Sequence, residues 1–161
     1  MQKGGNVTIR DSQGSVFGGG ISVQKKFMQM GGHLEIHNCS STYGGAIYAD
    51  SFEQIDGSLS IQECRALRRG GAIAAEFGHY GTGKFMQRGG DMLVHHCEAG
   101  EGGALAAKVF MQTSGRQVIH SCKAQQGGAI YAENALQRVG GSLTVRDCFA
   151  HGGRNLLAEG G

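Results

Sequence analysis

The stretch Gly44-Gly45-Ala46-Ile47-Tyr48-Ala49 recurs in close copies along the whole chain. Each copy follows a strand-like segment and a cysteine, as in Leu34-Glu35-Ile36 followed by Cys39. Successive cysteines are 25, 33, 25 and 26 residues apart, and Ser12 extends the series upstream. The sequence is therefore built from about six repeats of ~25 residues. The other copies begin at Gly70, Gly102 and Gly127, with weaker versions at Gly18 and Gly152.

A third segment completes each repeat. Phe27-Met28-Gln29 recurs as Phe85-Met86-Gln87 and Phe110-Met111-Gln112, with looser versions at Phe52 and Leu136. All three segments have the length of short strands, and the glycine pairs lie where the chain must turn sharply. Three strands per repeat leave no room for helices. The repeats therefore predict a parallel β-helix that spans residues 1–161 as one domain, with a loop insertion at about 77–84.

A leucine-rich-repeat solenoid is the alternative fold. The segment Leu59-Ser60-Ile61-Gln62-Glu63-Cys64 also fits the L-x-L-x-x-C core of that motif. Leucine-rich repeats, however, return through a helix or a helix-like arc, and here the return begins with a glycine pair. Glycine costs about 1 kcal/mol in a helix interior, which favours the β-helix.

Alternation along the strands predicts which side chains face inward. Leu34 and Ile36 are expected inside, and so are Ile47 and Ala49. The alanine after each glycine pair and the tyrosine two positions later are expected outside. A stripe of small residues lets another surface approach closely, so we expect an interaction face here. Its residues are Ala46, Ala72, Ala104, Ala129, Tyr48 and Tyr131.

Composition excludes several classes of protein. Glycine accounts for 30 of the 161 residues, and proline and tryptophan are absent, so the chain is not collagen. A hydrophobic fraction of 40% argues against a flexible linker. The net charge of +2 is small and dispersed, which does not indicate nucleic-acid binding. No apolar run reaches the ~20 residues of a transmembrane helix.

The cysteines share one repeat position and should form a column inside the coil. Neighbouring turns would bring their Cα atoms about 4.8 Å apart, within the range for disulfides. A packing role as free thiols is the favoured interpretation, because buried cysteine behaves as a small hydrophobic residue. The members of this column are Cys39, Cys64, Cys97, Cys122 and Cys148.

Three histidines are weak candidates for a metal site. His95 and His120 are expected on adjacent turns, and His96 lies beside them. A set of four ligands is missing, so a solvated histidine stack is favoured and no metal or other cofactor is predicted.

No catalytic residues are predicted. Enzymatic β-helices require clustered carboxylates, and the acidic residues considered form no facing group in the sequence. Glu98 with Glu101 is the nearest cluster and is interpreted as a solvated turn. The others are Asp11, Glu35, Asp50, Glu63, Asp91 and Asp147.

The insertion resembles a phosphate-binding loop only in part. Gly78-His79-Tyr80-Gly81-Thr82-Gly83-Lys84 is followed by Phe85, where such a loop needs serine or threonine and then a helix. A nucleotide site is therefore not predicted. Loops that project from rigid scaffolds often bind partners, so His79, Tyr80 and Lys84 are expected to contact one.

The tetrads Gly44-Gly45-Ala46-Ile47, Gly70-Gly71-Ala72-Ile73, Gly102-Gly103-Ala104-Leu105 and Gly127-Gly128-Ala129-Ile130 resemble the GGA[IL] repeats of chlamydial polymorphic outer-membrane proteins and related algal surface proteins. This resemblance implies a right-handed parallel β-helix with an adhesive role, on a cell surface or secreted. The companion F-x-x-N motif of that family is not matched. Here Ile36-His37-Asn38-Cys39 stands in its place.

These observations predict a non-catalytic module for adhesion or scaffolding. Met1-Gln2-Lys3-Gly4-Gly5 aligns with the interior of a repeat, so we expect a segment of a longer solenoid. Its partners would be other proteins or adjacent turns of the parent chain. Two alternatives stay open. One is a structural subunit of a large, membrane-associated assembly, in an organelle or inside the cell. The other is a carbohydrate-active β-helix whose catalytic turns lie outside this segment.

Overall fold

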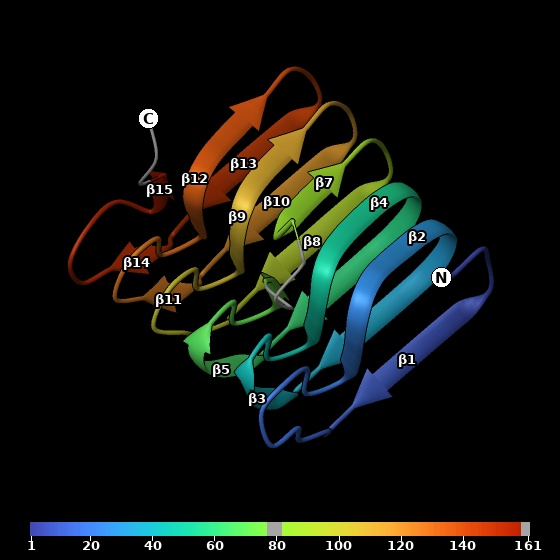
Figure 1. Ribbon diagram of the computed structural model, residues 1–161, viewed down its shortest axis with the longest axis horizontal. Coiled ribbons are helices and arrows are strands. Elements are labelled where there is room, and N and C mark those ends of the chain that lie inside the picture. Colours follow the sequence, from blue (N-terminus) through green and yellow to red (C-terminus); the bar gives the residue numbers. More distant parts are fainter. Residues whose placement is uncertain (77–81, 159–161) are drawn as a thin grey trace.

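The structure is a computed structural model that describes residues 1–76 and 82–158. Within these ranges the protein consists of strands and short turns (Figure 1). They contain no helix, and so no helix that could span a bilayer. The strands are β1 (Asn6–Arg10), β2 (Ile21–His37), β3 (Ser40–Tyr43), β4 (Ile47–Gln62), β5 (Arg65–Arg69), β6 (Ile73–Ala75), β7 (Lys84–Gln87), β8 (Asp91–His95), β9 (Leu105–Gln112), β10 (Arg116–His120), β11 (Lys123–Ala124), β12 (Ile130–Arg138), β13 (Ser142–Arg146), β14 (Phe149–Ala150) and β15 (Leu156–Ala158).

These strands pair in parallel with their equivalents in neighbouring repeats. Eleven of them form one sheet that wraps around the coil, while β3 with β5 and β11 with β14 form two short sheets at one edge (Figure 1). The chain winds as a right-handed parallel β-helix of about five turns, which confirms the predicted fold class. A leucine-rich repeat is excluded because the described part of the chain returns through strands. The turns are fewer than the predicted six because β1 covers only the end of β2, and β15 only the start of β12.

Both glycines of each pair are needed at the corner, for different reasons. Gly44 has a φ of 66°, a backbone conformation that favours glycine. Gly45 lies against the next turn, and a Cβ at this position would lie 2.1 Å from the carbonyl oxygen of Gly71. The pair therefore allows both a sharp corner and close stacking of the turns.

The alanine after each glycine pair faces inward, which corrects the predicted outward stripe. Ala46 and Ile47 both donate their backbone N–H groups to the carbonyl oxygen of Ala72, at 3.0 and 2.9 Å. Ala46 lies in the bend of the corner, just before β4 begins at Ile47, so the alternation of sides within a strand does not apply to it. Both side chains therefore enter the core. The alanines at this position are fully buried: Ala46, Ala72, Ala104 and Ala129.

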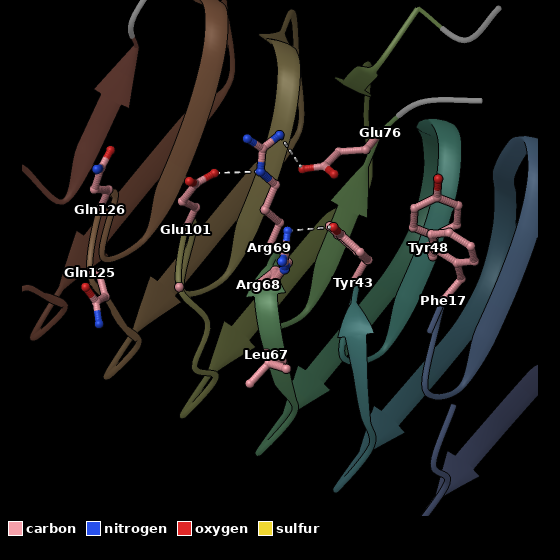
Figure 2. A pocket seen from close by; sticks show the side chains of 11 residues that line it. Phe17, Tyr43, Tyr48, Leu67, Arg68, Arg69, Glu76, Glu101, Gln125 and Gln126 are labelled. Atoms are coloured by element: carbon pink, nitrogen blue, oxygen red, sulfur yellow. Dashed lines mark hydrogen bonds and ion pairs between the residues drawn. The ribbon is translucent and has the colours of Figure 1, made fainter. Parts of the chain in front are cut away.

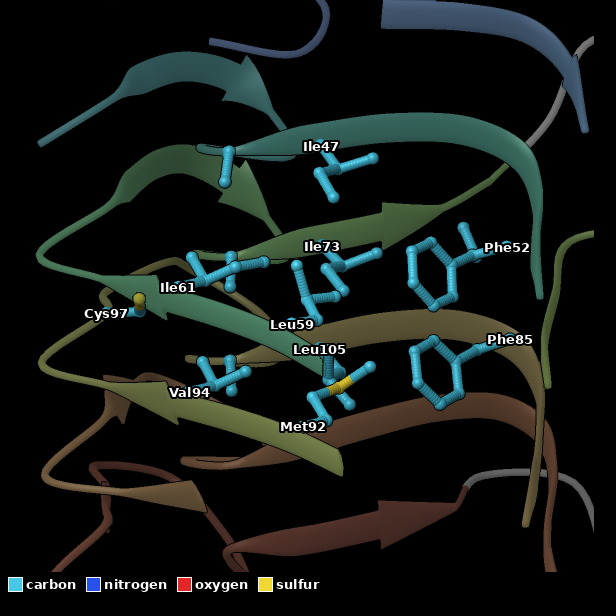
Figure 3. Packing of buried hydrophobic residues seen from close by; sticks show 14 of the residues in the cluster. Ile47, Phe52, Leu59, Ile61, Ile73, Phe85, Met92, Val94, Cys97 and Leu105 are labelled. Carbon is cyan, nitrogen blue, oxygen red and sulfur yellow. The ribbon is translucent and has the colours of Figure 1, made fainter. Parts of the chain in front are cut away.

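Columns of like side chains fill the interior, one residue from each turn (Figure 3). The predicted inward positions are confirmed, since Leu34, Ile36, Ile47 and Ala49 are all buried. The phenylalanines of the third segment stack along the axis with nearly parallel rings. The ring centroids are 5.4 Å apart for Phe27–Phe52, 5.1 Å for Phe52–Phe85 and 5.1 Å for Phe85–Phe110.

A column of buried glutamines runs beside the phenylalanines. Gln87 Nε2 donates to Oε1 of Gln54 at 3.2 Å and to the carbonyl oxygen of Arg116 at 3.1 Å. Gln112 Nε2 donates in turn to Oε1 of Gln87 at 3.1 Å. Arg138 follows in the next turn, and its Nε donates to Oε1 of Gln112 at 3.0 Å. These hydrogen bonds make amide groups compatible with burial in the core.

The insertion interrupts one turn of the coil. Ala75 in β6 pairs with Ala107, and Lys84 in β7 pairs with Val109. Eight residues separate Ala75 from Lys84 in the sequence, whereas Lys108 alone separates Ala107 from Val109. The strands on either side, β4 and β9, run continuously past this point.

Candidate functional site

A groove of about 720 Å³ lies on the outside of the coil and crosses successive turns (Figure 2). We call it the lateral groove. Its volume is in the range of ligand-binding sites, ~300–1,000 Å³. Its lining residues come from four successive repeats and from Phe17 of the repeat before them. They are Phe17, Tyr43, Tyr48, Leu67, Arg68, Arg69, Glu76, Gly100, Glu101, Gln125 and Gln126.

One column of residues follows the length of the lateral groove. Its members directly precede the glycine pairs, and backbone bridges connect each member to the next. Interior positions keep similar side chains from turn to turn, whereas this position differs in every turn. We call it the variable column. It consists of Phe17, Tyr43, Arg69, Glu101 and Gln126.

Arg69 lies at the centre of the groove and contacts three carboxylates. Its Nη1 is 3.3 Å from Oε1 of Glu76, and its Nε is 2.6 Å from Oε2 of Glu101. Nη1 also lies 3.9 Å from Oε2 of Glu133. The guanidinium carbon is 5.7 Å from the centre of the Tyr131 ring. Because a planar guanidinium has its donors in fixed directions, these contacts hold the cluster in one arrangement.

The charge of this cluster changes near neutral pH. Burial raises the pKa of Glu76 to about 7, although Arg69 opposes the effect. Burial also lowers the pKa of Arg69, but Glu76 and Glu101 outweigh it and the net pKa is raised. The guanidinium therefore stays charged, while Glu76 exchanges its proton at about the pH of most cellular compartments.

Three aromatic side chains form one end of the lateral groove. The Phe17 ring centroid is 4.4 Å from that of Tyr48 and 5.8 Å from that of Tyr43. Phe17 is 46% exposed, and Tyr48 is buried. Burial raises the pKa of Tyr48 to about 12, so its phenol is neutral. The exposed Phe17 ring is thus supported by two neighbouring rings.

The tyrosines predicted for the interaction face lie outside the hydrophobic core, but both are buried. Tyr48 lines the lateral groove, and Tyr131 lies beneath the guanidinium of Arg69. Wherever the repeat has alanine instead of tyrosine, as at Ala74 and Ala106, that side chain is buried as well. The predicted flat stripe is therefore absent from the described surface, and a groove with mixed chemistry lies beside it.

The predicted loop residues are only partly within the described ranges. His79 and Tyr80 lie outside them, since residues 77–81 are not described. Lys84 is exposed and lines a second depression of about 320 Å³ together with Lys26 and Arg88. Both of these cations contact the buried carboxylate of Glu53, with Arg88 Nε at 2.6 Å. This carboxylate balances one of the three positive charges that line the depression.

The histidine stack forms on adjacent turns, as the repeat predicts. The rings of His95 and His120 are 4.9 Å apart and nearly parallel. His96 meets His95 edge-on, and their Nδ1 atoms are 2.8 Å apart. Burial and the neighbouring His120 lower the pKa of His95. Residues 1–76 and 82–158 contain no group of three or more potential ligands arranged to hold a metal ion.

The five cysteines occupy one column at a corner of the interior. Four are buried, Cys148 is half-buried, and all five are free thiols in the structure. Cys64 Sγ donates to the carbonyl oxygen of Gln62 at 3.3 Å, and the neighbouring thiols make equivalent contacts. Their redox state in solution stays a prediction. Thiol titration in denaturant tests it, with five free thiols expected.

Sequence reasoning missed the charged cluster. Arg69, Glu76 and Glu133 were not singled out, and the expectation that Glu101 belongs to a solvated turn is wrong. Two signals could have located these residues. The position before each glycine pair changes in every repeat. The position six residues after the first glycine is charged in all four full copies, as Asp50, Glu76, Lys108 and Glu133.

No family model, curated protein or solved structure significantly matches this chain. Its function must therefore be inferred from the geometry and chemistry of the lateral groove.

Proposed function

We propose that this protein is a non-catalytic interaction module, in which a rigid β-helix displays the lateral groove to another molecule. The variable column carries this proposal. In a parallel stack, every position has its own copies as neighbours, and repeated side chains satisfy those contacts. A column that changes in each turn, and that lines a 720 Å³ groove, is more useful for recognition than for stacking.

The carboxylate contacts support binding over bond cleavage. Glycoside hydrolysis uses two carboxyl groups on opposite sides of the scissile bond. Glu76 and Glu101 instead contact the same guanidinium, that of Arg69, at 3.3 and 2.6 Å. Two carboxyl groups that contact one cation are not placed on opposite sides of a substrate, so this arrangement supports binding.

A role as a structural subunit of a large assembly is the second candidate. Large apolar side chains outside the groove are exposed singly, including Val139 and Phe149. Burial of such side chains against a partner would stabilise the complex. This candidate and the adhesive role suggested by the resemblance both require protein surface, but only the adhesive role requires the lateral groove.

An adhesion assay with a matched pair of variants tests the proposal. Beads that carry the chain would be tested for retention on a panel of cell monolayers. Leu67→Arg places a long cation at the rim of the groove, where Leu67 is 75% exposed. Val139→Arg changes a residue that is 81% exposed and does not line the groove. Retention should fall for Leu67→Arg and persist for Val139→Arg.

Three results would contradict the proposal. The first is that wild-type beads are retained by none of the cell types. The second is that both variants reduce retention equally, which would favour the assembly role. The third is the release of reducing ends or unsaturated products from a panel of polysaccharides, which would show catalysis.

A further inference from the structure

The backbone of the variable column is hydrogen-bonded between turns at Tyr43 and Glu101. Tyr43 N donates to the carbonyl oxygen of Val16, and Tyr43 O accepts from the N–H of Gly18, both at 2.9 Å. Glu101 makes the same kind of paired contacts with Arg68 and Gly70, at 2.7 and 2.9 Å. An extended peptide binds a sheet by adding to a free edge. That mode is closed here, so a ligand must be recognised by side chains.

The side chains of the groove combine flat apolar faces with planar polar groups. The exposed Phe17 ring lies at one end, and the amides of Gln125 and Gln126 lie at the other. The guanidinium of Arg68 is exposed between them, with Nη1 3.5 Å from the Tyr43 hydroxyl. A sugar ring has the matching features. Its C–H face packs on an aromatic ring, and its hydroxyl groups both donate to and accept from amide, carboxylate and guanidinium groups.

The shape of the groove suits a chain of sugars better than a single ring. The variable column crosses four steps between turns, from Phe17 to Gln126. At a spacing of ~4.8 Å, these steps span ~19 Å. The aromatic and amide ends are therefore too far apart for one sugar ring to touch both.

The charge distribution selects against strongly charged ligands. Two guanidinium groups, on Arg68 and Arg69, lie near the carboxyl groups of Glu76, Glu101 and Glu133. A polyanion would meet the carboxylates around Arg69, and a basic peptide would meet both arginines. Juxtaposed like charges oppose binding, whereas an uncharged polyhydroxylated chain avoids both costs.

We infer that the lateral groove binds an uncharged glycan chain that lies along the coil axis, with a sugar ring packed on Phe17. This inference rests on the proposed function, because it names the ligand of the same groove. Phe17 provides the apolar contact, and the amides and charged groups of the later turns provide hydrogen bonds.

Calorimetric titration of the full chain tests the inference. The probes are neutral oligosaccharides of increasing length from glucan, xylan, mannan and galactan, together with an oligogalacturonate and an oligolysine. At least one neutral series should bind, more tightly with length until the groove is spanned. Phe17→Ala should weaken this binding by about tenfold, since the ring contributes most of the apolar contact. Phe149→Ala is the matched control, because Phe149 is 53% exposed and does not line the groove.

Several outcomes would overturn the inference. These are no binding by any neutral series, tighter binding of the oligogalacturonate or oligolysine, or equal effects of the two substitutions. Thermal unfolding of both variants verifies that each keeps its fold. The proposed function is tested separately by bead retention. Retention that depends on Leu67 without any glycan binding would preserve the interaction role and reject the glycan.

Discussion

The interior columns and the variable column are built on the same turns but follow opposite rules. Phe52, Phe85 and Phe110 repeat one side chain at one geometry, with ring centroids 5.1 Å apart and planes within 3°. The variable column instead passes from aromatic to cationic to anionic to amide groups. Only the first kind of column can form the core, because apolar rings and amides pack well against copies of themselves.

Charged groups cannot follow that rule. A column of identical charges would place like charges on adjacent turns, which is destabilising. The variable column instead sets Arg69 beside Glu101, with 2.6 Å between Nε and Oε2. The difference teaches that repetition serves stacking, whereas departure from repetition marks the surface that is available for function.

The largest expected effect compares one phenylalanine from each region. Phe85→Ala should lower the free energy of unfolding by about 4 kcal/mol, because it opens a cavity between Phe52 and Phe110. Phe17→Ala should lower it by less than about 1 kcal/mol, since the ring is half exposed. Urea unfolding followed by circular dichroism measures both. Similar losses would break the distinction between the two regions.

The next effect concerns the pH dependence of stability at the groove. Burial raises the pKa of Glu76 from 4.5 to about 7, so the folded state binds this proton more tightly than the unfolded state. The resulting stabilisation is complete below pH 4.5 and is lost as the pH rises through 7. Its magnitude is on the order of 3 kcal/mol. Glu76→Gln should remove this part of the pH dependence in urea titrations at pH 5 and pH 8.

Glu133→Gln is the control for this measurement, because Glu133 is half-buried and lies farther from Arg69, at 3.9 Å. It should leave the difference between pH 5 and pH 8 nearly unchanged. An unchanged profile for Glu76→Gln would show that another group dominates this pH range.

A smaller loss of stability is expected when a glutamine of the interior column is replaced. Gln87→Leu keeps a similar shape but removes the amide that donates to Oε1 of Gln54 and to the carbonyl oxygen of Arg116, at 3.2 and 3.1 Å. We expect a loss of about 2 kcal/mol. Gln126→Leu, in the variable column, should change stability by less than about 0.5 kcal/mol. Thermal melts of the two variants measure the difference. A larger loss for Gln126→Leu than for Gln87→Leu would contradict the assignment of Gln87 to the interior column.

The smallest expected effect is a gain in stability at the corner before each cysteine. Glu63 has a φ of 55°, and its equivalents Asp11, Asn38 and Asp147 have φ values of 54°, 52° and 53°. Asparagine and aspartate tolerate this left-handed conformation better than other residues with side chains. Glu63→Asn should therefore stabilise the fold by about 0.5 kcal/mol. Glu98→Asn, at an exposed position outside the positive-φ group, should give no gain; equal gains would refute the backbone explanation.

Much of the fold could be predicted because the repeat period determines which residues lie next to each other on neighbouring turns. The cysteine column and the His95–His120 stack follow from spacing alone, since residues one period apart meet in a parallel stack. The inward direction of Ala46 could not be read this way. Ala46 lies in a bend before the strand that begins at Ile47, and alternation determines the side of a residue only within a strand.

The glutamine column was recognisable as a repeated residue, but its burial was not. A buried amide is acceptable only when its hydrogen bonds are satisfied, and those bonds reach the chain of neighbouring turns. The composition of the Phe-Met-Gln segment therefore indicates a strand, but it does not indicate that the glutamine side chain lies inside the coil.

The repeat was sufficient to define the stacking direction and the columns, because each residue's neighbours along the axis are its own copies. The lateral groove depends instead on contacts between residues at different positions of the repeat. Arg69 meets Glu76 from its own turn, Glu101 from the next and Glu133 from the turn after that. These contacts depend on how the corner folds back over the strand that follows it. Periodicity constrains contacts along the axis, whereas packing within each turn selects the contacts across it.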